Sequence, residues 1–198
     1  VTLLSRFLTN LIIPPFPMTI PLINIPFRKH GVMRLLSLAL LSVVLVCAGG
    51  CRASKGAAER DRLQDQISHS KLDRTQKLIA EEAVSWMGTP YKYGGSEKGK
   101  GTDCSGMVLK VYEKVLDKKL PRNSAKQAEF CRKIRKRDVK VGDLVFFATG
   151  KDADRVSHVG IMIDDRNFIH ASTRKGVIVS DVTTPYYERT FIMYGRVE

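Results

Sequence analysis

The sequence of 198 residues lacks an uninterrupted apolar run long enough to cross a membrane as a helix. Residues 7–27 carry no charged side chain, but five prolines interrupt them, and proline breaks the interior of a helix. Residues 35–46 are all uncharged and mostly apolar, but a membrane-spanning helix needs about 20 such residues. We therefore expect no transmembrane helix in this chain.

Cysteine is also scarce, with four residues and no Cys-x-x-Cys pair of the kind that marks many zinc and redox sites. A His-x-x-x-His pair is absent too. Cys104, His158 and His170 could supply three zinc ligands, but the sequence offers no evident fourth. The cysteines lie in or just after a hydrophobic leader and at helix ends, so we expect no structural disulfide. For want of a fourth ligand we expect no metal, and the mechanism implied by the family resemblance described below needs no cofactor.

Acidic residues are missing from the first 50 positions, where Met33-Arg34 precedes the apolar run 35–46 and small residues lead to Cys51. This order resembles a bacterial lipoprotein signal peptide. We expect translation to start at Met33, residues 1–50 to form a leader, and Cys51 to carry the lipid (palmitate) that anchors the protein. The polar stretch 51–71 has no strong apolar face and predicts a flexible tether, which leaves 72–198 as the folded domain.

The whole chain is basic, with a formal charge of +13. Such a charge favours an anionic neighbour: nucleic acid, a lipid surface or an acidic polymer such as a cell wall. An exported, lipid-anchored chain would seldom meet nucleic acid, so we expect no nucleic-acid partner. The basic cluster 132–137 is interpreted as a solvated turn.

Beyond the tether, the period of the apolar residues changes from helical to alternating. Helices are expected over 72–87, 104–117 and 124–131, and strands over 143–147, 158–163, 168–171, 177–182 and 191–197. Helices first and strands later, with no internal repeat, predict an α+β domain with an antiparallel sheet.

Cys104 is the candidate nucleophile because it directly follows Asp103, a good helix N-cap, at the end of a glycine-rich loop. In the first turn, the helix dipole and the free N–H groups stabilise an anion, so the thiol there should ionise more readily than a free one. A small buried side chain that happens to open a helix would give the same pattern. This segment alone leaves both interpretations open.

Two histidines, His158 and His170, lie on strands that a turn would join into a hairpin. Both face the same way if the turn holds an odd number of residues, and we predict a three-residue turn at 165–167 with Asn167 left-handed. Both side chains would then point towards the start of the Cys104 helix. His158 would share a proton with the thiol, and His170 would hold the far nitrogen of the His158 ring. For either histidine alone, a structural role is the alternative.

Several short motifs follow one another along the chain: Gly88–Gly95, Asp103–Gly106, Leu120–Arg122 with Ser124 and Gln127, Gly142–Phe147, Ser157–Ile161 and Phe168–Ser172. In this order, over about 72–198, they resemble the NlpC-type bacterial cell-wall cysteine peptidases. Val141 departs from the family pattern, which usually has proline there.

The resemblance implies a papain-like α+β fold, with N-terminal helices packed on a C-terminal antiparallel sheet. It implies a cysteine endopeptidase that hydrolyses peptide bonds in peptidoglycan stem peptides or crosslinks through an acyl-enzyme. Cys104 takes the place of the nucleophile, His158 that of the base and His170 that of the third polar residue.

The resemblance also implies that Tyr91, Asp103 and Ser105 bind substrate, although packing for Tyr91 and helix capping for Asp103 explain these residues equally well. An amidase or acyltransferase on the same scaffold, or a non-catalytic wall-binding lipoprotein, are the alternative functions. The expected partners are peptidoglycan stem peptides and, through Cys51, a membrane. We expect a monomer in the bacterial cell envelope, anchored in the outer membrane and facing the periplasm.

Overall fold

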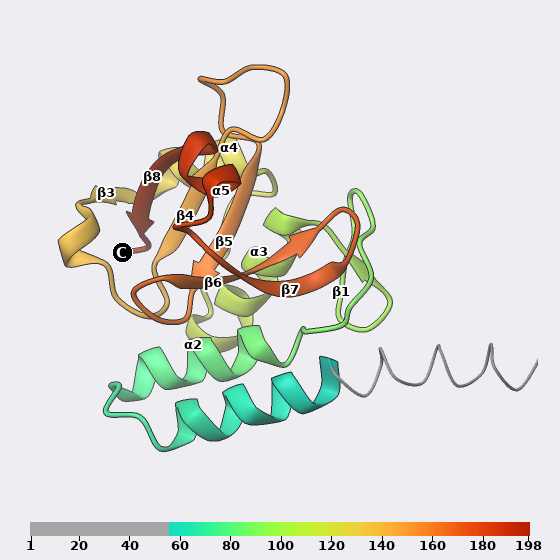
Figure 1. The fold of residues 1–198 in the computed structure, drawn as a ribbon, viewed down its shortest axis with the longest axis vertical. Helices are drawn as coiled ribbons and strands as arrows, with labels where there is room; N and C mark the ends of the chain where they lie inside the picture. Colours follow the sequence, from blue (N-terminus) through green and yellow to red (C-terminus); the bar gives the residue numbers. More distant parts are fainter. Residues whose placement is uncertain (1–55) are drawn as a thin grey trace, which may run out of the picture. The chain divides into compact units, whose positions relative to one another are not determined.

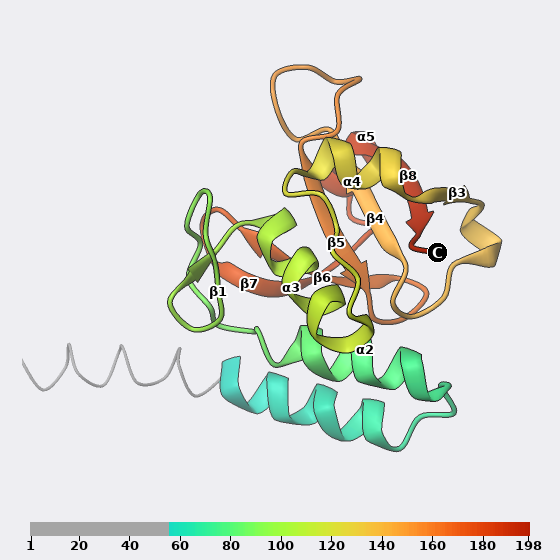
Figure 2. The ribbon, with the colours of Figure 1, turned by 180° about the vertical axis from the view of Figure 1, so that it is seen from behind.

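The computed structural model describes residues 56–198, which Figures 1 and 2 show from opposite sides. The predictions for the leader, for the start at Met33 and for the lipid on Cys51 lie outside the described residues. No helix in the described part is long and apolar enough to cross a membrane.

Helices come first in the chain and most strands come later. The helices are α2 (Arg74–Val84), α3 (Cys104–Leu116), α4 (Ser124–Phe130), the 3-10 helix η1 (Lys136–Asp138) and α5 (Pro185–Thr190). The strands β1 (Ser96–Glu97) and β2 (Gly101–Thr102) form a small ribbon before α3. The predicted α+β class is confirmed.

The main sheet has six strands in the order β3-β8-β4-β5-β6-β7, and every neighbouring pair is antiparallel. Its strands are β3 (Arg132–Ile134), β4 (Leu144–Phe147), β5 (His158–Met162), β6 (Asn167–Ser172), β7 (Gly176–Asp181) and β8 (Phe191–Arg196). The interpretation of 132–137 as a solvated turn is wrong, because its first half pairs with β8 and buries Ile134.

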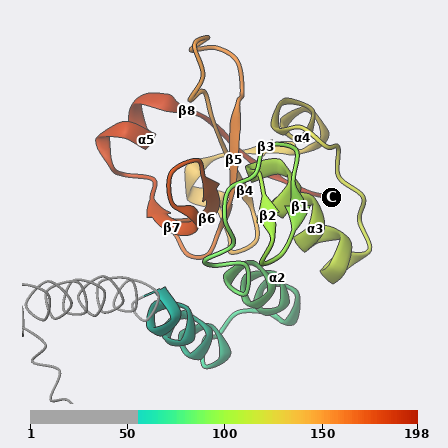
Figure 3. The same cartoon turned by 90° about the vertical axis from the view of Figure 1, so that its right-hand side faces the viewer.

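The two faces of the sheet are covered by different helices. Val159 and Ile161 of β5 pack with α2 and α3 in the larger apolar cluster. Phe147 and Phe168 lie on the other face, in a smaller cluster against which Tyr187 of α5 packs. Figure 3 accordingly shows α3 and α5 on opposite sides of the central strands. Because side chains alternate along a strand, His158 belongs to the face of α5.

The stretch expected as a flexible tether is instead helical over 56–68. This helix runs beside α2 (Figures 1 and 2). Ile67 is buried in the larger cluster and Leu63 packs against it, since residues four apart lie on one face of a helix. Two apolar residues are too few to stand out in a polar sequence, but the surface they cover makes this helix part of the domain.

The hairpin that carries the two histidines has a three-residue turn, as predicted, but at 164–166. Ile161 pairs with Ile169, and the N–H of Ile163 donates to the Asn167 carbonyl over 2.9 Å. The Asp164 carboxylate accepts the N–H groups of Arg166 and Asn167, which draws the turn one residue earlier. Asn167 is not left-handed: among the described non-glycine residues only Asp117 has a positive φ.

Gly160 lets this hairpin close, and replacing it with alanine is expected to destabilise the fold. An alanine Cβ would lie 2.5 Å from Phe168 Cδ2 and 2.9 Å from the Ile169 carbonyl oxygen. Overpacking of this kind lowers the free energy of unfolding by about 3 kcal/mol. Urea unfolding of Gly160→Ala measures it. Gly150→Ala is the matched control, because its nearest neighbour, Ser157 Oγ, would be at an ordinary 3.5 Å. Equal stability of the two variants would contradict this role of Gly160.

Candidate active site

The start of α3 is held by the carboxylate of Asp103, which is the helix N-cap as predicted. Its Oδ1 accepts the Gly106 N–H over 2.8 Å, and its Oδ2 accepts the N–H of Gly94 over 2.9 Å. Arg122 donates to both oxygens, over 2.9 and 2.8 Å. Burial alone would raise the pKa of Asp103, but these hydrogen bonds outweigh burial and lower it. One carboxylate therefore ties the glycine-rich loop, the helix start and Arg122 together.

Arg122 and Gln127, which follow α3 in the chain, form further hydrogen bonds to the first turn of that helix. The Ser105 hydroxyl donates to the Arg122 carbonyl over 2.7 Å. The buried Gln127 side chain donates to the carbonyl oxygens of Ser105 and Pro121, over 3.0 and 2.8 Å. No individual role was predicted for Arg122 or Gln127, although both stand in the motifs that carry the family resemblance.

The thiol of Cys104 is 8% exposed and lies in the first turn of α3. Burial is the largest influence on it and raises its pKa to about 11. The backbone N–H groups of Val159, Ser105 and Cys104 itself act in the opposite direction, and the negative charge of Asp103 adds to the rise. The expectation that this thiol ionises more readily than a free one is therefore wrong, because desolvation of the buried thiol exceeds the effect of the helix start.

His158 and His170 are joined as predicted, with His158 Nε2 and His170 Nδ1 2.8 Å apart. On its far side, His170 Nε2 lies 3.0 Å from Ser180 Oγ and 3.1 Å from Tyr187 OH. If Nδ1 of His158 is unprotonated, as a base requires, Nε2–H donates to His170, whose own Nε2–H donates to Ser180 and Tyr187. Ser180 and Tyr187 carried no recognisable signal in the sequence, because their contact with His170 arises only from the packing of β7 and α5.

The thiol lies at the backbone of β5, one residue along the chain from His158, where β5 and β6 separate. The two strands pair only at Ile161 and Met162, so the first residues of β5 do not pair with β6. The Val159 N–H is therefore available to the Cys104 sulfur, one residue from His158. Within residues 56–198 no hydrogen bond joins this sulfur to the His158 ring, and the Nδ1 of His158 has no hydrogen-bond partner there.

Burial lowers the pKa of both histidines, to about 4 for His158 and well below the ordinary value for His170, where the charge of His158 adds to the effect. Both rings are therefore neutral near pH 7. The unfolded chain, with histidine pKa values of about 6.5, binds protons that the folded chain excludes.

The free energy of unfolding is consequently expected to be highest above pH 6.5 and to fall as the pH drops from 6.5 towards 4. The slope is at most about 1.4 kcal/mol per pH unit for each histidine. Urea unfolding at several pH values measures it. His158→Gln should show a shallower slope, whereas His69→Gln, which alters a 79% exposed ring, should keep that of the wild type. A profile that is flat between pH 6.5 and 4.5 would contradict this account.

Two hollows flank the centre. One, of about 350 Å³, is lined by Cys104 and by all three predicted substrate-binding residues, Tyr91, Asp103 and Ser105, together with Arg122. Partial burial, and then the negative charges of Cys104 and Asp103, raise the pKa of Tyr91. The other, of about 430 Å³, is lined by both histidines.

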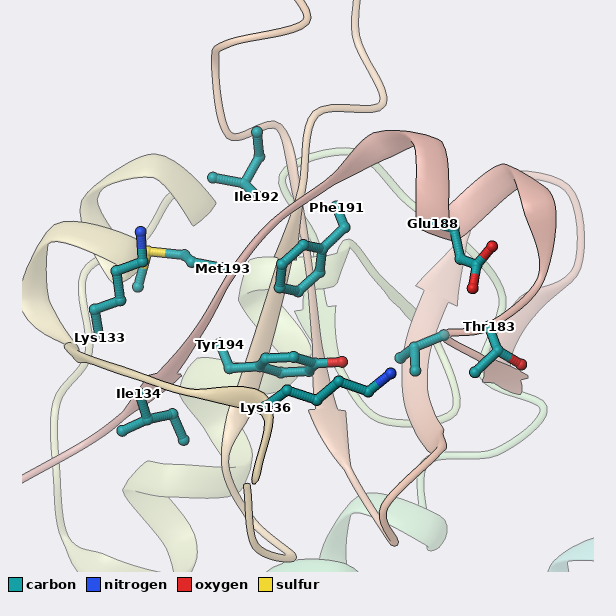
Figure 4. A pocket seen from close by; sticks show the side chains of 10 residues that line it. Lys133, Ile134, Lys136, Thr183, Glu188, Phe191, Ile192, Met193 and Tyr194 are labelled. Carbon is teal, nitrogen blue, oxygen red and sulfur yellow. The ribbon is translucent and has the colours of Figure 1, made fainter. Parts of the chain in front are cut away.

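A further hollow of about 440 Å³ lies between β3, β8 and α5 (Figure 4). Phe191, Ile192 and Tyr194 line it with Lys133 and Lys136, and it shares no residue with the two hollows at the thiol and the histidines. It is therefore separate from the candidate active site. In the described part of the chain, no three His, Cys, Asp or Glu side chains are grouped so that they could hold a metal ion.

Comparison with known proteins places these features in a family. The NlpC/P60 family model matches residues 88–196. The chain is 36% identical to the probable endopeptidase NlpC of Escherichia coli K12 over 161 residues, which are 80% of this chain and 97% of that protein. It is 33% identical over 150 residues to the E. coli protein named murein DD-endopeptidase MepS/murein LD-carboxypeptidase, 76% of each chain.

Among solved structures, a Staphylococcus aureus protein described as similar to lipoprotein, of the NLP/P60 family, matches with a TM-score of 0.57 and 32% identity. The match covers 65% of this chain and 43% of that one. An NlpC/P60 family protein from Bacillus cereus matches with a TM-score of 0.56 and 29% identity, over 63% of this chain and 40% of the other. This chain thus spans less than half the length of either protein.

Proposed function

The chain belongs to the NlpC/P60 family, and from that premise we propose that it is a peptidoglycan hydrolase: a cysteine endopeptidase that cuts peptide bonds in stem peptides or crosslinks. The observation that carries the proposal is the position of the Cys104 thiol at the backbone of β5, the strand that begins with His158. Cys104 opens α3 inside a hollow, its sulfur lies at the β5 backbone beside His158, and His170 holds the far nitrogen of His158.

The proposed reaction starts from a neutral thiol and a neutral imidazole. The Cys104 proton passes to the Nδ1 of His158, which has no hydrogen-bond partner within the described residues, while Nε2 stays with His170. The Nε2–H bond to His170, which Ser180 and Tyr187 orient, stabilises the imidazolium that results. Substrate that fills the hollow replaces water there and strengthens the attraction between thiolate and imidazolium.

The thiolate then attacks the amide carbonyl carbon, and the N–H groups at the start of α3 stabilise the oxyanion. His158 returns the proton to the leaving amine as the C–N bond breaks. Water, deprotonated by His158, hydrolyses the thioester and regenerates the thiol. This route uses no metal and no cofactor.

The contacts of Asp103, Ser105 and Tyr91 within the protein indicate which of these three residues is free to bind substrate. Both oxygens of Asp103 are already engaged, so we propose that it acts mainly by holding the loop and helix, with Ser105 beside it. Tyr91 is only partly buried and has no hydrogen bond from its hydroxyl within the described residues, which leaves that hydroxyl free for substrate.

The remaining sequence predictions complete the proposal. We propose a monomer in the cell envelope, anchored through a lipid on Cys51 and facing the periplasm from the outer membrane. A lipid anchor would hold the catalytic domain near its substrate, and the positive charge of the chain suits an acidic polymer.

Digestion of purified peptidoglycan sacculi by the full chain tests the function. We expect soluble muropeptides with new amino ends, identified by mass spectrometry, which also tells which bond is cut. An added amine acceptor separates hydrolysis from acyl transfer, because a transferase would give acceptor-linked products. Binding to sacculi without any release of fragments would support the non-catalytic alternative and contradict the proposal.

A further inference from the structure

The hollow on the histidine side has a composition unlike that of the hollow at the thiol. Its lining comes from the chain after β4, from the start of β5, from the end of β6 with the turn that follows, and from α5. Besides the two histidines, it includes Thr149, Arg174, Tyr186 and Tyr187. Tyr186 is 48% exposed and presents an aromatic surface.

Arg174 gives this hollow its charge. It is exposed in the turn between β6 and β7, and no acidic residue lines the hollow with it. Among residues 56–198 it forms no ion pair, unlike Arg166, which pairs with Asp181, and Arg196, which pairs with Asp143. The hydroxyls of Ser172 and Thr173, which also line the hollow, have no side-chain hydrogen bond in that part of the chain. The hollow thus offers one unpaired guanidinium and free hydroxyl groups.

The direction of the reaction decides which half of a substrate reaches this hollow. The acyl half becomes bound to Cys104, which lines the other hollow. The amine that leaves must accept its proton from His158, so the leaving fragment has to approach His158, which lines the second hollow.

We propose, on the basis of the function proposed above, that this hollow is the subsite for the leaving fragment and that Arg174 binds a free carboxylate of that fragment. A guanidinium and a carboxylate fit each other through two parallel hydrogen bonds, which a neutral amide cannot reproduce. Stem peptides carry free carboxylates on the amino acids that follow a cleaved bond, so the ligand class is the α-carboxylate of an amino acid.

The test uses two synthetic peptides that contain the bond found to be cut in the sacculus digest. One ends in a free carboxylate on the leaving side and the other in a carboxamide. The wild type should prefer the carboxylate peptide by about tenfold in kcat/KM, mainly through KM, since a hydrogen bond to a charged partner at an exposed site is worth roughly that factor. Arg174→Gln should remove the preference by lowering only the rate on the carboxylate peptide.

Lys175→Gln is the matched control, because Lys175 is the adjacent exposed cation in the same turn and does not line the hollow. It should keep the preference of the wild type. A preference that survives in Arg174→Gln, or that is absent from the wild type, would overturn the subsite.

A binding measurement separates this inference from the function on which it rests. Titration calorimetry of both peptides against Cys104→Ala, with and without Arg174→Gln, measures the carboxylate preference without turnover. Preference for the carboxylate that depends on Arg174 supports the subsite even if cleavage is not observed, and cleavage without such a preference contradicts the subsite alone.

Discussion

Replacing Cys104 with alanine is expected to abolish the release of muropeptides from sacculi, with a loss of about 10⁴-fold or more in kcat. Two hydroxyls that line the same hollow are unsuited to replace the thiol: Ser105 is engaged with Asp103 and Arg122, and Tyr91 is a poor nucleophile with a raised pKa. The measurement is the rate at which new amino ends appear.

The matched control is Cys131→Ala, which removes a second buried, free thiol at the end of α4. Burial raises the pKa of Cys131 too, to about 12, so the two cysteines differ in position rather than in exposure. Cys131→Ala should keep the activity of the wild type, and urea unfolding should show that both variants are folded. Undiminished activity in Cys104→Ala would remove the proposed nucleophile, and equal loss in both variants would point to a structural effect.

Replacing His158 with glutamine is expected to lower kcat/KM by about 10³-fold. The amide of glutamine can still donate to His170, but it cannot take the thiol proton or return it to the leaving amine. Alkylation of Cys104 by iodoacetamide is a second readout. In the free wild type the thiol should react slowly at pH 7 and faster as the pH approaches its pKa of about 11.

His69→Gln serves as the control for loss of a histidine, since His69 directly follows the helix 56–68, lines neither hollow and has a 79% exposed side chain. It should leave cleavage unchanged. Full activity of His158→Gln would exclude His158 as the base. Rapid alkylation of the wild type at pH 7 would show instead that the resting centre is already a thiolate–imidazolium pair.

Features that depend on a few neighbouring residues could be predicted from the sequence. Asp103 caps α3 because its short side chain, directly before the helix, places an acceptor oxygen within reach of the free N–H groups of the first turn. The shared face of His158 and His170 follows from the alternation of strands and an odd turn, so an error of one residue in the position of the turn did not change it.

Features that arise from packing between distant segments could not be predicted. The ionisation of Cys104 depends on how deeply β5 and the glycine-rich loop bury it, and no local pattern gives that depth. Arg122 meets Asp103 from 19 positions away, and Tyr187 meets His170 from 17. The helix over 56–68 is stabilised by packing against the domain, which its own polar sequence does not indicate.

That same helix changes where the protein should be cut for expression. The family match begins at residue 88 and the expected domain at 72, yet Leu63 and Ile67 cover apolar side chains of the catalytic domain. A truncation at either position would remove Leu63 and Ile67 and expose apolar surface that promotes self-association. A soluble fragment for crystallography should therefore retain the helix that carries Leu63 and Ile67.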